Sequence, residues 1–181
     1  MILGISGKLG SGKSTITKLI LAADPRYQHK SFASKLKIIT HIMTGLPIDD
    51  MYSQEGKNKY LPEWGMTVGT FQQLIGTNAI RNGIHQQAWV ISLFAEYKKE
   101  DFWVIDDVRF KNEADAIKER DGILLRVNGD PAGTRANSKR DLTHPSETDL
   151  DDYVGWDGVY DNVGTLQNLE TYAKLILAKW A

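Results

Sequence analysis

Cysteine is missing from this chain of 181 residues. Its absence excludes disulfide bonds, thiolate metal sites and thiol nucleophiles, and it fits the cytoplasmic location that we expect. The chain also lacks an excess of either charge, because 22 basic and 23 acidic side chains leave a formal net charge of −1. A broad basic surface for direct nucleic-acid binding is therefore not expected, whereas a small anionic ligand needs only a local basic cluster.

Long hydrophobic runs are lacking as well. The longest, residues 88–95, is interrupted by Ser92 and is far too short to span a bilayer. The N-terminus shows no basic segment followed by an apolar run and a cleavage site, so we expect a soluble protein without membrane association. A chain of this length can bury one good core but not two, which predicts a single domain, residues 1–181, with an inserted lid.

A glycine-rich stretch near the start, residues 4–20, reads GISGKLGSGKSTITKLI. From Gly7 to Ser14 it matches the pattern G-x-x-x-x-G-K-[ST], between an apolar run that predicts a strand and an apolar stripe that predicts a helix. Loop N–H groups and the helix N-terminus would surround phosphate oxygens, Lys13 would reach the β and γ phosphates, and Ser14 would bind Mg²⁺. The residues expected to hold the nucleotide here are Gly7, Gly10, Ser11, Gly12, Lys13, Ser14 and Thr15.

The rest of the chain alternates apolar strands with amphipathic helices. Further strands are expected at residues 27–32, 102–110 and 122–127, and helices at residues 36–43, 67–82, 89–97, 113–120 and 165–180. This alternation predicts an α/β fold of the P-loop NTPase kind, in which helices flank a parallel sheet on both faces. Residues 48–66 show no sustained period and are interpreted as an irregular insertion, and residues 128–148 as a mobile lid.

Two adjacent aspartates, Asp106 and Asp107, follow the apolar part of the strand at residues 102–110. A P-loop nucleotidase needs a carboxylate at the end of a neighbouring strand to hold the magnesium shell. Side chains alternate between the two faces of a strand, so only one of the pair is expected in this role. Alternatively, either aspartate could be a helix N-cap or could lie at a solvated strand end without binding a metal.

Polar and basic side chains elsewhere are candidate binding groups. Gln73, Thr77 and Arg81 form a stripe at spacing i, i+4 and i+8, which a solvated helix face explains equally well. Trp64 could stack on a base. The cations in or beside the lid-like segment could surround a transferring phosphoryl group or serve only solubility, and they are Arg126, Arg135, Lys139 and Arg140.

Four later stretches carry a more specific signal than the glycine loop. They are SFASKLK (31–37), YLPEWGMTVGTFQQLIGTNAIRNGIHQQAWV (60–90), DDVRFKNEADAI (106–117) and HPSETD (144–149). Together they resemble the phage-type deoxynucleoside monophosphate kinases, over residues 1 to about 149. The resemblance implies a nucleoside-monophosphate-kinase-like P-loop fold that uses Mg²⁺ and ATP to phosphorylate a deoxynucleoside monophosphate (dNMP). It also implies a helical acceptor-binding region at about residues 32–98 and suggests a homodimer.

The same resemblance implies roles for single residues. Asp107, Arg109, Asn112 and Glu113 match the signature D-V-R-F-x-N-E-A, which favours Asp107 over Asp106 beside the metal. The residues expected around the acceptor are Phe32, Lys35, Trp64, Gln72, Gln73, Arg81 and Glu147. The expected catalytic residues are Lys13, Arg81, Asp107 and Arg109, the expected metal ligands are Ser14 and Asp107, and the additional cations on the ATP side are Arg135 and Arg140.

Two other functions stay open at this point. A P-loop kinase of another small phosphorylated metabolite would share the sheet, loop and lid and would differ only in its acceptor pocket. A nucleotide-dependent switch or binding module is the second, although the stretch nearest to the guanine-reading pattern N-K-x-D, NSKRD at residues 137–141, does not fit it. Among acceptors, dGMP, dTMP and 5-modified dCMP are all compatible with the resemblance.

Overall fold

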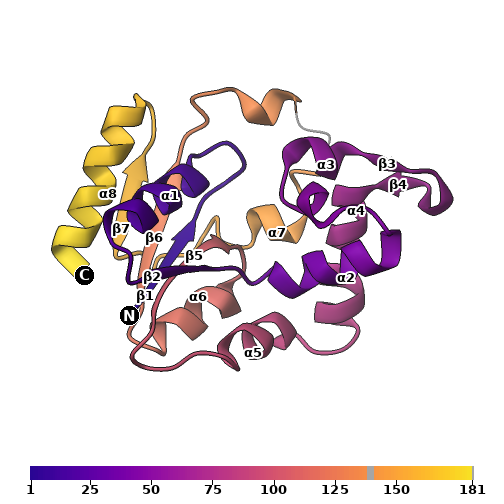
Figure 1. The fold of residues 1–181 in the computed structure, drawn as a ribbon, viewed down its shortest axis with the longest axis horizontal. Coiled ribbons are helices and arrows are strands. Elements are labelled where there is room, and N and C mark those ends of the chain that lie inside the picture. The colour runs from indigo at the N-terminus through magenta and orange to yellow at the C-terminus, as the bar shows by residue number, and fades with distance from the viewer. Residues whose placement is uncertain (138–140, 181) are drawn as a thin grey trace.

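A five-stranded parallel sheet forms the centre of the computed structural model, which describes residues 1–137 and 141–180 (Figure 1). Its strands are β1 (Ile2–Ser6), β2 (Tyr27–Lys30), β5 (Phe102–Val108), β6 (Ile123–Asn128) and β7 (Gly158–Asp161). They stand in the order β2-β5-β1-β6-β7, and each neighbouring pair is parallel. The predicted α/β fold with a parallel sheet is confirmed, and the carboxyl ends of its strands share one edge.

Apolar sequence accounts for the central strands. All residues of β1 are buried, as expected for a strand covered on both faces. Leu3 and Ile5 enter one hydrophobic cluster, whereas Ile2 enters the other. The sequence pattern does not predict β7, because its four residues, GVYD, alternate in burial over too short a run to stand out.

Helices cover both faces of the sheet (Figure 1). On one face, α1 (Lys13–Ala23) packs beside α8 (Leu166–Trp180), and on the other lie α5 (Ala88–Phe94) and α6 (Lys111–Lys118). The helices expected at both places are confirmed to within a few residues at their ends. Within the described ranges, no helix has the length and apolar character needed to cross a membrane.

A mainly helical region is inserted between β2 and β5. Its elements are α2 (Ser34–Thr44), η1 (Ile48–Met51), α3 (Gln54–Asn58), β3 (Tyr60–Leu61), η2 (Pro62–Trp64), β4 (Met66–Thr67), α4 (Val68–Gln73) and η3 (Leu74–Asn82). It has a small core of its own, made of Met51, Leu61, Val68 and Phe71. The elements within residues 48–66 are only two to five residues long, which explains why that stretch shows no sustained period.

The helix expected at residues 67–82 is present, but it changes from an α-helix to a π-helix at Leu74. Gly76 lies in the π-helical part, where a Cβ atom would come within 2.8 Å of the Leu36 side chain. The Trp89 indole N–H donates to the Gly76 carbonyl oxygen at 2.9 Å. Long π-helical stretches are rare and often accompany functional sites. Here the π-helix lies close against α2 and forms one wall of a cavity.

The segment at residues 128–148 begins beside the glycine loop. It contains two short helical turns, η4 (Thr134–Asn137) and α7 (Pro145–Thr148). The Asp130 carboxylate accepts hydrogen bonds from the backbone N–H groups of Thr134 and Arg135, at 2.8 and 2.9 Å. Two of the expected lid cations, Lys139 and Arg140, lie outside the described residues.

Candidate active site

The glycine loop joins β1 to α1, as the motif predicts. Gly10 and Gly12 have left-handed backbone, with φ of 78° and 98°, which glycine adopts without a steric penalty. A Cβ atom at Gly10 would also lie 2.1 Å from Asp130 Oδ1, so this position needs glycine for packing. Because α1 begins at Lys13, the loop stands at the positive end of the helix dipole. The arrangement suits phosphate groups.

Lys13 is the first residue of α1, and its side chain contacts the glycine loop. Its Nζ donates to the Lys8 carbonyl oxygen at 2.8 Å. Burial, and after it the nearby Arg109 guanidinium, lowers the pKa of Lys13 to about 7. A desolvated ammonium group of this kind is stabilised when an anion binds beside it.

Asp106 faces the same side of the sheet as the loop. Its carboxylate contacts His29 Nε2 at 2.8 Å and lies on the same side as the Ser14 hydroxyl. Burial raises the pKa of Asp106, but its interactions with His29 and Ser14 outweigh burial, so the pKa lies below its usual value. A carboxylate that stays ionised thus lies beside the expected metal ligand Ser14.

Asp107, the next residue of β5, has different partners and lies where the register between β5 and β1 shifts. It accepts hydrogen bonds from Ser31 Oγ at 2.7 Å and from the backbone N–H groups of Phe32 and Ala33 at 3.0 and 2.9 Å. The expectation that Asp107 lies beside the metal stays a prediction, and Asp106, which also lies beside the loop, is the alternative carboxylate. Asp107 itself fixes the chain where it enters α2.

A cleft of about 750 Å³ opens beside the glycine loop. Besides loop residues and Asp106, it is lined by two lysines that sequence reasoning missed, Lys37 and Lys57. The Lys37 ammonium lies 4.1 Å from the centroid of the Tyr52 ring. Burial lowers the pKa of Lys37. The cleft thus gathers cations that have partly lost their water, which favours an anionic ligand.

Lys35, expected in the acceptor pocket, points away from this cleft. Its Nζ donates to the Ser92 carbonyl oxygen at 2.8 Å and lies 3.3 Å from Glu96. Two steps along an α-helix rotate the side chain by about 200°, so Lys35 and Lys37 lie on opposite sides of α2. The stretch SFASKLK contains both lysines, and choosing between them requires the orientation of α2.

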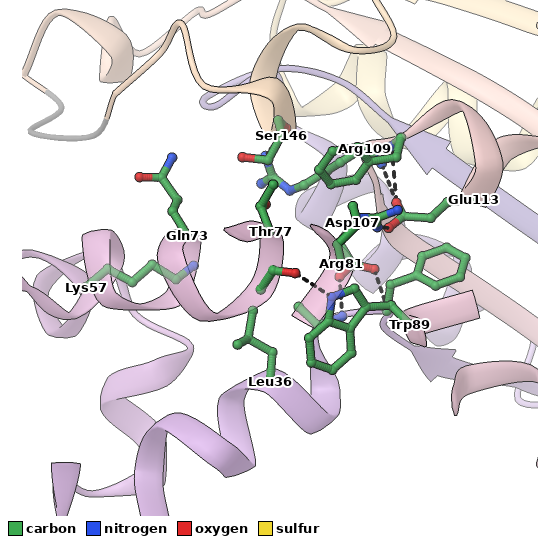
Figure 2. A pocket seen from close by; sticks show the side chains of 14 residues that line it. Leu36, Lys57, Gln73, Thr77, Arg81, Trp89, Asp107, Arg109, Glu113 and Ser146 are labelled. Atoms are coloured by element: carbon green, nitrogen blue, oxygen red, sulfur yellow. Dashed lines mark hydrogen bonds and ion pairs between the residues drawn. The ribbon is translucent and has the colours of Figure 1, made fainter. Parts of the chain in front are cut away.

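A smaller cavity of about 110 Å³ lies between α2, η3 and the start of α6 (Figure 2). Its apolar wall is formed by Phe32, Leu36 and Trp89. Its polar lining includes Gln73, Thr77, Arg81, Glu113 and Ser146. Lys57, Asp107 and Arg109 line both this cavity and the larger cleft, so the two spaces meet at these residues.

The polar stripe of the helix at residues 68–82 faces this cavity. Thr77 and Arg81 are only 8% and 6% exposed, which rules out a solvated face for them. Gln73 also lines the cavity, and its Nε2 lies 3.4 Å from the Asp141 carbonyl oxygen. The stripe therefore lines a cavity and does not form a solvated helix face.

Arg81 is held by a buried ion pair. Its Nη2 lies 2.5 Å from Glu113 Oε1, and its Nη1 donates to Asn112 Oδ1 at 2.8 Å. The guanidinium also lies 3.7 Å from the centroid of the Phe110 ring. The other oxygen of Glu113 accepts the N–H groups of Arg109 and Phe110. The signature DVRFKNEA thus supplies both the strand end and the carboxylate that orients Arg81.

A second ion pair holds Arg109 at the junction of the two spaces. Arg109 Nη1 lies 2.5 Å from Glu147 Oε1 and 3.0 Å from the Ser146 carbonyl oxygen. Glu147 is 8% exposed, and α7 carries it to this position. Glu147 therefore acts on Arg109 rather than lining the smaller cavity itself.

Two residues expected around the acceptor lie elsewhere. Trp64 packs edge-on against Phe71, with ring centroids 4.6 Å apart. The Gln72 amide lies 3.6 Å from the Met51 sulfur. Within the described part of the chain, neither residue lines the smaller cavity. Each instead contacts a member of the small core of the inserted region from outside it, and Trp64 stays 39% exposed.

Comparison with known proteins connects this geometry to a family. No family model matches the chain. A putative deoxynucleotide monophosphate kinase of Acanthamoeba polyphaga mimivirus is 30% identical over 191 aligned positions, which cover 97% of this chain and 94% of the relative. The chain belongs to the deoxynucleotide monophosphate kinase family. The deoxynucleoside-5′-monophosphate kinase of Escherichia phage T5 is 37% identical over 83 positions, which cover 43% of this chain and 32% of that relative.

In this kinase, two further arginines lie beside the glycine loop. Arg135 donates from Nε to the Leu9 carbonyl oxygen at 2.9 Å and from Nη2 to the Gly129 carbonyl oxygen. Arg126 donates to Ser6 Oγ at 3.2 Å, and burial lowers its pKa. Both arginines are therefore close to the loop. Arg135, unlike Arg126, is one of the cations expected on the ATP side, and that role stays a prediction.

Proposed function

We propose that this protein transfers the γ-phosphate of ATP to the 5′-phosphate of a deoxynucleoside monophosphate, with Mg²⁺ as the metal ion. The observation that carries the proposal is the meeting of two spaces at Lys57, Asp107 and Arg109. One space starts at the glycine loop, and the other lies under η3. A donor and an acceptor can therefore reach the same point from two sides. The names of the mimivirus and phage T5 relatives support the same reaction.

On the donor side, the loop N–H groups and Lys13 would hold the phosphates of ATP. Ser14 and Asp106 both line the cleft beside the loop and offer oxygen atoms, the ligand type that Mg²⁺ prefers, so these residues fit the ion. Mg²⁺ in such a site neutralises charge on the β and γ phosphates. Asp107, whose carboxylate already accepts three hydrogen bonds, is assigned to the acceptor wall instead.

On the acceptor side, the base of the dNMP would lie against Phe32, Leu36 and Trp89. Its phosphate would approach Arg81, whose buried Nε finds no protein partner among the described residues. The Glu113 carboxylate keeps that guanidinium in place before the substrate arrives. An arginine oriented in advance binds phosphate with a smaller loss of conformational entropy.

The reaction would be a direct transfer without a covalent intermediate on the protein. A bond forms between an acceptor phosphate oxygen and the γ-phosphorus, while the bond from that phosphorus to the β–γ bridging oxygen breaks. The attacking phosphate is already anionic and needs no general base. Lys13, Lys37 and Arg109 would stabilise the charge of the transferring group from different sides. Catalysis then rests on positioning and charge.

A phosphotransfer assay with ATP and Mg²⁺ tests this proposal. The panel contains the common deoxynucleoside and ribonucleoside monophosphates together with unrelated phosphorylated metabolites. We expect turnover of one or a few dNMPs and loss of turnover in Lys13→Ala. Turnover of an unrelated acceptor alone would point to another small-molecule kinase. Tight nucleotide retention without any acceptor would point to a switch.

A further inference from the structure

Asn162 links the last strand of the sheet to the glycine loop. It follows β7 directly and is 2% exposed. Its side-chain Nδ2 donates a hydrogen bond of 2.9 Å to the carbonyl oxygen of Ser11, which is fully buried in the loop. Its backbone N–H donates to the Asn128 carbonyl oxygen at the end of β6, at 3.0 Å. Asn162 is therefore anchored to the sheet before its side chain reaches the loop.

The neighbouring backbone leaves room for this side chain. A Cβ atom at Gly12 would lie 2.6 Å from Asn162 Nδ2, and a Cβ atom at Gly129 would lie 2.2 Å from the Asn162 carbonyl oxygen. Both contacts are shorter than real Cβ atoms tolerate. The close packing of Asn162 therefore requires glycine both in the loop and at the start of the 128–148 segment.

The Asn162 bond restrains one peptide group. In a planar trans peptide the C=O and N–H bonds point in opposite directions, so fixing the Ser11 carbonyl outward turns the Gly12 N–H inward. In the described part of the chain, the Gly12 N–H donates to no protein acceptor. The orientation of the Asn162 amide is set as well, because the Ser11 carbonyl oxygen facing it can only accept.

From this geometry we infer that Asn162 is a positioning residue for phosphate binding, acting through the Ser11–Gly12 peptide. The inference rests on the proposed function, since it concerns the site that holds the donor phosphates. Asn162 has no place in the acceptor cavity. Its loss should therefore weaken the binding of polyphosphates and leave acceptor binding unchanged.

Binding of magnesium tripolyphosphate, measured by calorimetry, isolates the loop from recognition of the donor base and of the acceptor. In Asn162→Asp a carboxylate replaces an amide of the same shape, so the donor is lost and two oxygen atoms oppose each other. In Asn162→Ala the donor is lost without that repulsion. We expect tripolyphosphate and ATP to bind about tenfold more weakly in Asn162→Ala and weaker still in Asn162→Asp. The KM for the acceptor should stay within about twofold of wild type in both.

Folded variants that bind tripolyphosphate as wild type does would overturn the inference, as would an equal rise in the two KM values. The amide resonance of Gly12 in ¹⁵N-labelled wild-type protein gives a readout that needs no variant. It should shift strongly on addition of tripolyphosphate, and an unmoved resonance at saturation would also overturn the inference. Failure of wild type to bind ATP would instead contradict the proposed function, so the two failures are distinguishable.

Discussion

The donor and acceptor sides of this site are built in different ways. The proposed donor side is one continuous stretch, residues 7–15, in which backbone N–H groups would do much of the binding. The proposed acceptor side is assembled from side chains on α2, η3, the β5–α6 junction and α7, where a buried ion pair holds Arg81 and a partly buried one holds Arg109. A site made of backbone depends on local conformation, whereas a site made of side chains depends on distant partners. Acceptor specificity can therefore change while the loop stays the same.

The largest expected effect is that of Lys13→Ala on the donor side. Loss of the loop ammonium should lower kcat at least 10³-fold, about 4 kcal/mol of transition-state stabilisation. The measurement is a coupled assay, with circular dichroism to check that the variant is folded. Near-normal turnover in the folded variant would show that the Lys13 ammonium contributes little to catalysis.

The next largest effect is expected for the adjacent aspartates of β5. Asp106 is assigned to the donor side and Asp107 to the acceptor side, so their variants should differ. Asp106→Asn should lower kcat about 10²-fold and raise the Mg²⁺ concentration needed for half-maximal rate. Asp107→Asn should leave the Mg²⁺ requirement unchanged and lower the free energy of unfolding by about 1–3 kcal/mol, because its buried hydrogen bonds weaken. A shifted Mg²⁺ requirement in Asp107→Asn alone would reverse the assignment.

On the acceptor side, Arg81→Met should raise the KM for the dNMP at least about tenfold and leave the KM for ATP unchanged. The single variant leaves the Glu113 carboxylate buried without its partner, which costs about 3–5 kcal/mol of stability. The double variant Arg81→Met/Glu113→Gln should recover most of that stability, measured by urea unfolding, but not the acceptor KM. If the double variant recovers both the stability and the acceptor KM, Arg81 has only a structural role.

The two lysines of α2 form a matched pair. Lys37→Met should lower kcat/KM for the acceptor about tenfold, because its ammonium lies in the cleft. Lys35→Met, the control, should stay within about twofold of wild type, since its ammonium contacts α5. Equal losses of kcat/KM in steady-state assays of the two variants would contradict an orientation of α2 that places only Lys37 in the cleft.

The smallest effect concerns pH and belongs to the donor side. The pKa of Lys13 is lowered to about 7 in the free protein, so above pH 7 its amine is mostly neutral. Bound phosphates favour the charged form and raise that pKa. ATP binding should therefore take up close to one proton at about pH 8 but few at about pH 6, and its affinity should fall as pH rises above 7. Calorimetry in two buffers of different ionisation enthalpy measures the uptake, and none at pH 8 would contradict it.

Local patterns made most of the fold predictable. The glycine loop, the strands at residues 2–5, 102–110 and 122–127, and the helices beside them all have apolar runs or stripes long enough to show a period. β7 is short and only half buried, so its residues carry no such signal. Asn162, which depends on β7 for its position, could not be singled out for the same reason.

The features of the candidate site also fall into two groups, those that a local sequence pattern predicts and those that depend on packing. The sequence by itself determined the phosphate loop, because nine consecutive residues carry its backbone conformation and its charge. It also indicated a carboxylate at the end of β5 and a polar stripe around Thr77. Only the tertiary structure decided that Asp106 lies beside the loop, that Lys37 rather than Lys35 enters the cleft, and that Trp64 packs edge-on against Phe71. Each of these depends on how an element is rotated when it packs, which no local pattern specifies.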